Sequence, residues 1–142
     1  GDASPDRIVD EARRLVEQEG ANLLVGPLSG DEGVAIASYA ADTPGVTFVN
    51  GISGGQETTL HVQSENFFRW NGDGAQWNAG LGDILKNEAG GDKVAVIADD
   101  YSFGWTSAAG FVASLLFFLG PSDLRSIMHP TWESSETLSF PR

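Results

Sequence analysis

The chain has 142 residues, enough for one domain with its own core, and its 41% hydrophobic and 20% charged residues are typical of a globular protein. The formal net charge of −12 argues against nucleic acid or an anionic membrane surface as a partner. Cysteine is absent, which excludes disulfides, thiol catalysis and Cys-ligated zinc. The longest apolar run, Leu115–Leu119, is too short for membrane insertion by this segment.

The first half of the chain alternates predicted helices and strands. Ser4 is a suitable N-cap for an amphipathic helix, which Gly20 ends. Leu23–Gly26 is a continuous apolar run, as expected of a strand that is covered on both faces of a parallel sheet. A small, apolar helix is predicted at about Asp31–Ala41, and Val46–Val49 reads as the next strand.

The second half continues this alternation. A short extended segment at Phe67–Trp70 precedes a predicted helix at about Gly74–Glu88. Lys93–Ala98 is the clearest strand in the chain, and apolar residues at helical spacing predict a last helix over Trp105–Leu119. This order predicts the α/β class, with a parallel, doubly wound sheet in a three-layer sandwich.

The two ends of the chain differ from its middle. It begins at Gly1 without a Met, a signal peptide or an opening strand, so we expect it to be incomplete. After Arg125 the periodicity is lost, and residues 126–142 are predicted to form an irregular tail, as at a truncated or misframed end. The predicted organisation is therefore a partial ligand-binding lobe at residues 1–125 followed by this tail.

Ligands of parallel α/β sheets bind beyond the carboxyl ends of the strands, and three loops occupy that position. These loops are Leu28–Gly33, Asn50–Gly55 and Asp99–Gly104. In the first, Ser29 and Gly30 offer a hydroxyl and free N–H groups at a helix N-terminus, which suits a small polar or anionic group. The alternative is that Ser29 only caps the helix.

The other two loops have alternatives of the same kind. Ser53 lies in the parallel position of the second loop and either contacts a ligand or bonds its own backbone in a turn. Tyr101 and Phe103 either wall a pocket or pack under the third loop. Asp99 and Asp100 are acidic neighbours, but no third acidic residue completes a magnesium site, so we favour a solvated turn.

The sequence shows no catalytic constellation. His61 and His129 are isolated from any partner at metal-ligand spacing. Ser29 does not lie in a G-x-S-x-G nucleophile elbow, and Gly51–Gly55 lacks the glycine spacing of a dinucleotide fingerprint. We therefore predict no enzyme activity, no cofactor and no metal.

Four segments, in this order, carry a resemblance to a known family. They are Ala21–Ala41 (ANLLVGPLSGDEGVAIASYAA), Phe48–Leu60 (FVNGISGGQETTL), Asn66–Asp83 (NFFRWNGDGAQWNAGLGD) and Val94–Phe111 (VAVIADDYSFGWTSAAGF). Together they resemble the substrate-binding proteins of branched-chain amino acid type ABC transporters, the type I periplasmic binding proteins. The resemblance runs from about Gly1 to Gly120.

The resemblance implies two α/β lobes joined by a hinge, with the ligand held between them. This chain would be an incomplete N-terminal lobe that lacks the opening strand, the first helix and the second strand. The ligand-binding positions it implies are Ser29 and Gly30 in the first loop, Ile52 and Ser53 in the second, and Phe103, with Tyr101 nearby, in the third.

The implied function is capture without chemistry. The protein would be the solute-binding component of an ABC uptake system, periplasmic or anchored at the extracellular surface, and would present a small polar ligand to a permease. Asp31 and Glu32 oppose a ligand carboxylate, so a branched-chain amino acid, an amide and a urea-like compound all remain candidates. The alternative is a ligand-sensing domain of a receptor or regulator with the same fold; a Rossmann-like enzyme lobe is less favoured.

Overall fold

The computed structural model describes residues 3–61, 64–89, 93–118 and 137–139. The first half of the chain builds a three-stranded parallel sheet with the strand order β1–β2–β3. Its strands are β1 (Leu23–Val25), β2 (Thr47–Asn50) and β3 (Phe67–Arg69). Its helices are α1 (Pro5–Glu17), α2 (Gly30–Ala41) and the short α3 (Glu57–Leu60). The predicted α/β class, with parallel strands and flanking helices, is confirmed.

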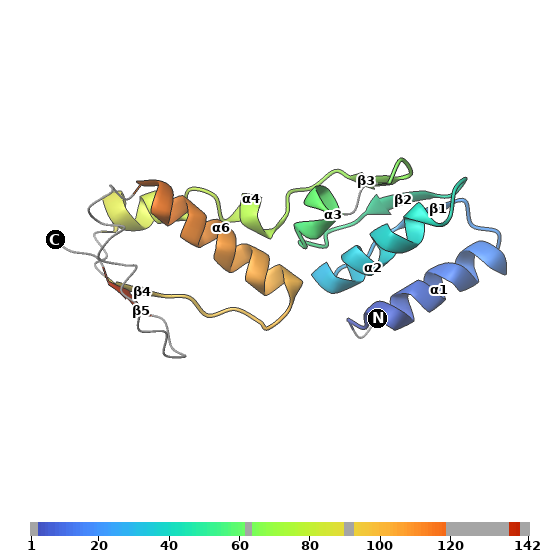
Figure 1. Ribbon diagram of the computed structural model, residues 1–142, viewed down its shortest axis with the longest axis horizontal. Helices are drawn as coiled ribbons and strands as arrows, with labels where there is room; N and C mark the ends of the chain where they lie inside the picture. Colours follow the sequence, from blue (N-terminus) through green and yellow to red (C-terminus); the bar gives the residue numbers. More distant parts are fainter. Residues whose placement is uncertain (1–2, 62–63, 90–92, 119–136, 140–142) are drawn as a thin grey trace.

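Helices α1 and α2 pack side by side against one face of this sheet (Figure 1). Phe48 of β2 is 1% exposed and packs with Ala12 of α1 and Ile36 of α2. Leu24 of β1 and Phe67 of β3 pack against the same cluster. The apolar stripes that predicted the two helices are therefore the surfaces that form the core.

The opposite face of the sheet is open in the described part of the chain. The strand register places Val25, Val49 and Phe68 side by side on this face. Val25 is 72% exposed and Phe68 54% exposed. The expected burial of the first strand on both faces is therefore not observed among the described residues, because α1 and α2 both pack on the other side.

The second half of the chain forms a separate group of elements. They are α4 (Gly74–Trp77), α5 (Leu81–Asp83), the π-helix η1 (Ile84–Glu88), β4 (Lys93–Ala95), α6 (Ser102–Phe118) and β5 (Thr137–Ser139). Helix α6 lies against α4 and α5, where Gly82 lies on Leu115 and Gly110 lies on Ala75 so closely that neither glycine has room for a Cβ. Figure 1 shows this group extending away from the sheet, with β4 and β5 at its far end.

Two predicted elements were wrong. The strand predicted at Lys93–Ala98 is shorter and does not join the parallel sheet, because β4 pairs antiparallel with β5. An apolar run indicates a strand but does not select its pairing partner. The single helix predicted at Gly74–Glu88 is divided, because Gly80 adopts a φ of +92° between α4 and α5.

Of the predicted tail at residues 126–142, the structure describes only residues 137–139. Residues 137–139 form β5, although we expected no regular structure there. The other residues after 118, including His129, lie outside the described ranges. The division at residue 125 remains a prediction.

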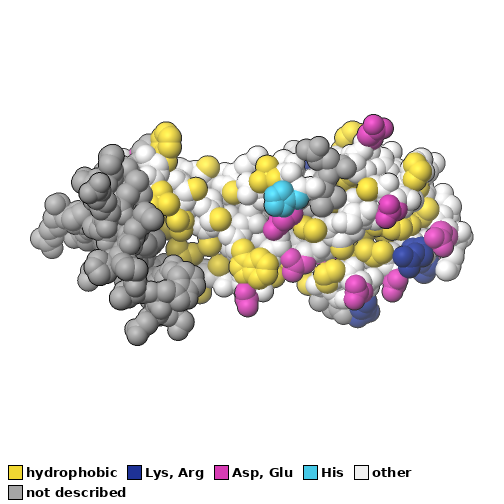
Figure 2. All heavy atoms as spheres, in the orientation of Figure 1, with side chains coloured by type: hydrophobic (Ala, Val, Ile, Leu, Met, Phe, Trp, Pro, Cys, Tyr) yellow, Lys and Arg dark blue, Asp and Glu magenta, His cyan; other side chains and the backbone are white. Residues whose placement is uncertain are grey.

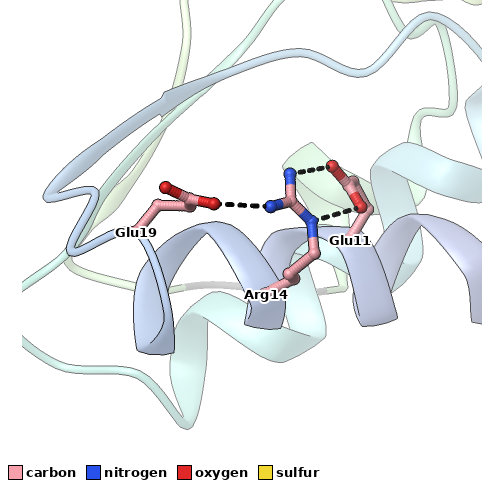
Figure 3. Close-up of polar contacts among 3 residues, drawn as sticks. All are labelled: Glu11, Arg14 and Glu19. Carbon is pink, nitrogen blue, oxygen red and sulfur yellow. Dashed lines mark hydrogen bonds and ion pairs between the residues drawn. The ribbon is translucent and has the colours of Figure 1, made fainter.

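The surface carries few basic side chains. In Figure 2 the clearly visible Lys and Arg side chains gather over the α1 end of the molecule. There, Arg14 donates hydrogen bonds to Glu11 and Glu19 (Figure 3). The hydrogen bond from Arg14, together with its charge, lowers the pKa of Glu11. The network is exposed and screened by salt, so it contributes little to stability.

None of the described helices has the length and hydropathy needed to cross a bilayer.

Candidate functional site

The three predicted loops meet where the two groups of elements touch. A Cβ added at Gly30 would lie 2.8 Å from the backbone nitrogen of Phe103, and the Phe103 ring lies directly against Gly54. The three loops therefore lie against one another, while a shared ligand pocket at this place remains a prediction. Phe103, however, begins α6 and approaches from the second group, not from a neighbouring strand of the sheet. We call this contact region the junction.

Ser29 is the N-cap residue of α2 and is 8% exposed. Its N–H donates to the Glu32 carboxylate at 3.3 Å, and its side chain faces the Glu32 N–H, so both halves of a capping box are present. The hydroxyl oxygen is buried, and its contact with the Glu32 N–H lies outside normal hydrogen-bond geometry. Ser29 therefore occupies the capping position that was the alternative to ligand binding.

Ser53 is fully buried at the end of the loop that follows β2. Its N–H donates to Asn50 Oδ1 at 3.1 Å. The hydroxyl oxygen sits against Gly33 of α2, where a larger residue would collide with it, and it has no partner in the described part of the chain. The turn bond from the hydroxyl to its own backbone, which was the alternative to ligand contact, is not formed among the described residues. Ser53 thus brings an unpaired buried hydroxyl to the first turn of α2.

Aromatic rings line the α6 side of the junction. Phe103 makes an edge contact with Trp77 at a centroid distance of 5.9 Å and lies 6.1 Å from the Tyr101 ring. Trp77 is 44% exposed and ends α4. Trp77 is not among the predicted site residues, because the sequence predicted one unbroken helix at about Gly74–Glu88 and not the break between α4 and α5.

Not every predicted residue faces the junction in the same way. The side chain of Ile52 is 55% exposed, and its N–H donates to the Pro27 carbonyl at 3.4 Å. Asp100 accepts a hydrogen bond from the Trp105 indole at 2.9 Å, which fits the solvated turn that we favoured.

His61 is exposed. The described residues include no group of three His, Cys, Asp or Glu side chains that could hold a metal ion.

Arg69 is the residue of this region that sequence reasoning missed. Its Nη1 donates to the Ser53 carbonyl and its Nη2 to the Gly55 carbonyl, both at 2.8 Å, and Nη2 also bonds Thr58 Oγ1. Burial lowers the pKa of Arg69, and the charge of Asp73 partly opposes this effect. The sequence feature that could have indicated its role is a single Arg at the end of a short apolar strand. Arg69 holds the second loop in the shape that buries the Ser53 hydroxyl.

A separate hollow of about 550 Å³ lies beside β3. Its walls include Arg69, Trp70 and Asn71, but none of the six predicted ligand-binding residues. The amide nitrogen and oxygen of Asn71 are both buried without a partner among the described residues. The side chains of Arg69 and Thr58 line the hollow and also bond the Gly55 carbonyl of the second loop, so they connect the hollow with the junction.

Comparison with known proteins agrees with this architecture. The sequence pattern of the family described as periplasmic binding protein matches residues 1–131, so the chain belongs to that family. The predicted resemblance is confirmed, since the similar solved structures are solute-binding proteins of ABC transporters. No curated protein gives a significant match.

Three solved structures illustrate the similarity. A solute-binding protein of Rhodopseudomonas palustris in complex with benzoate has a TM-score of 0.72 and 22% identity, over 81% of this chain and 31% of that one. One from Rhodopseudomonas palustris BisB5 with 3,4-dihydroxybenzoic acid has a TM-score of 0.68 and 26% identity, over 81% and 31%. A leucine-binding protein of Thermotoga maritima has a TM-score of 0.68 and 20% identity, over 82% and 33%. The chain therefore spans about a third of the length of these proteins.

Proposed function

We propose that this protein is the solute-binding component of an ABC uptake system, and that it captures a small ligand at the junction. The observation that carries the proposal is the fully buried hydroxyl of Ser53, which lies against the first turn of α2 and has no partner among the described residues. Buried polar groups are normally hydrogen-bonded, and an exception calls for an explanation. A bound ligand would supply the missing partner, and Ser29 lies at the N-cap of the same helix.

The ligand is a small molecule with a polar head and an apolar body. The hydroxyls and the free N–H groups at the α2 N-terminus bind the head, and the rings of Phe103, Trp77 and Tyr101 cover the body. A branched-chain amino acid, an amide and a urea-like compound all have this form. Benzoate and 4-hydroxybenzoate, which are bound in two of the similar solved structures, and leucine, the ligand that names a third, fit it as well.

The remaining parts of the proposal follow from this role. The mechanism is binding and release, with no bond made or broken, so the protein is not an enzyme. The partner is an ABC permease, and the location is the periplasm or the outer surface of the cell. The net charge of −12 supports the absence of a nucleic-acid partner.

The test removes each hydroxyl in turn. We expect Ser29→Ala and Ser53→Ala each to weaken binding of the preferred ligand about 3- to 10-fold, the effect of one lost hydrogen bond between neutral groups. Binding is measured by titration calorimetry of the full-length protein with leucine, leucinamide, benzoate and benzamide. If none of the four binds, the proposed function is wrong.

Ser107 provides a matched control. Its hydroxyl is also buried without a described partner, but it lies against Gly74, one turn of α6 beyond Phe103, and not at the α2 N-terminus. Ser107→Ala should leave the affinity unchanged. An equal loss in all three variants would show that the effect comes from general destabilisation and would contradict a binding role for Ser29 and Ser53.

A further inference from the structure

We propose that the junction selects a ligand whose head group is a nitrogen that donates hydrogen bonds and carries no negative charge, such as a primary amide, over a carboxylate. This inference rests on the proposed function and concerns the same site. It follows from the charges that the structure gathers around the two Ser hydroxyls.

Three carboxylates surround the junction. Asp31 Oδ1 accepts the Ser102 N–H at 3.2 Å, and Glu57 Oε2 accepts the Ser102 hydroxyl at 3.0 Å. Both carboxylates therefore lie against Ser102, the residue that precedes Phe103. Glu32, which is also in the first turn of α2, is 5% exposed and accepts the Ser29 N–H at 3.3 Å. Negative charge therefore already lies at the N-termini of α2 and α6, where the head group of a ligand would bind.

Little positive charge balances these carboxylates. No ion pair within the described residues involves any of the three, because the ion pairs of that part of the chain lie on α1 and its C-terminal end. The guanidinium of Arg69 donates to the carbonyls of Ser53 and Gly55, behind the loop. The N-termini of α2 and α6 add roughly half a positive charge each. Three negative charges exceed this total, so a further anion meets repulsion.

The hydrogen-bonding capacity of the site points the same way. Ionised carboxylates only accept hydrogen bonds, and a Ser hydroxyl accepts two and donates one. The junction is therefore rich in acceptors, which a carboxylate ligand cannot satisfy but an N–H donor can. The rings of Phe103 and Trp77 contact the apolar body of a ligand and not its head group. Ligands that differ only in the head group can therefore be compared directly.

The experiment compares matched pairs of ligands. Benzamide and benzoate share one ring, and leucinamide and leucine share one side chain, so each pair isolates the exchange of a carboxylate for an amide. We expect calorimetric titration of the full-length protein at low salt to show each amide binding about tenfold or more tightly than its acid. Equal or tighter binding of the acids would overturn the inference while leaving the proposed function in place.

Two variants test the origin of the preference. Asp31→Asn and Glu57→Gln each remove one negative charge with little change of shape, and each should lower the ratio of amide to acid affinity several-fold. Asp42→Asn is the control, because Asp42 is exposed at the opposite end of the same helix and should leave the ratio unchanged. An unchanged ratio in both junction variants would overturn the inference. If none of the four probes binds, the proposed function fails and the inference fails with it.

Discussion

Replacing Phe48 with alanine should lower the free energy of unfolding by about 3–5 kcal/mol, the usual cost of truncating a buried Phe. Phe48 is 1% exposed and lies between the sheet and both of its helices, with an edge contact to the Tyr39 ring at 5.8 Å. Its removal leaves a cavity that α1 and α2 cannot both move to fill. Urea denaturation followed by circular dichroism measures the loss.

Phe68 is the matched control for this change. It is the same residue type on the adjacent strand, but it is 54% exposed on the open face of the sheet. Phe68→Ala should therefore cost far less than Phe48→Ala. Similar losses for the two variants would mean that the open face is covered and that our account of the sheet is wrong.

Replacing Arg69 with methionine should destabilise the protein by about 3 kcal/mol, because it leaves buried carbonyl oxygens without donors. Methionine retains most of the apolar stem, but it cannot donate to the Ser53 and Gly55 carbonyls that Arg69 now holds at 2.8 Å. The second loop should loosen, so ligand affinity should fall together with stability. Denaturation and calorimetry on the same variant measure the two effects.

Two further variants sharpen this result. Arg69→Lys should recover only part of the loss, since one ammonium group cannot reproduce the planar fork of a guanidinium. Arg14→Met should change stability little, because the Arg14 pairs with Glu11 and Glu19 are exposed on α1. Full rescue by lysine would show that only the charge of Arg69 matters, contrary to the role we assign to it.

The location of the site could be predicted in part from the sequence. Ser29 and Gly30 follow a strand, and Ser53 follows the neighbouring parallel strand, so their meeting at one edge follows from chain order alone. The contribution of Arg69 could not be predicted in this way. Its partners lie 11 to 16 positions earlier in the chain, and only the pairing of β2 with β3 brings them within reach.

Local patterns in the sequence determined β1, α2 and β2, because periodicity, a helix cap and glycine stops act within a few residues. The tertiary structure alone decided that β4 pairs with β5, that α6 reaches the junction from outside the sheet, and that Asp31 and Glu57 both bond to Ser102. These are contacts between segments far apart in the chain. An apolar run or a carboxylate encodes a need for burial or for a hydrogen-bond donor, but it does not encode which distant residue will meet that need.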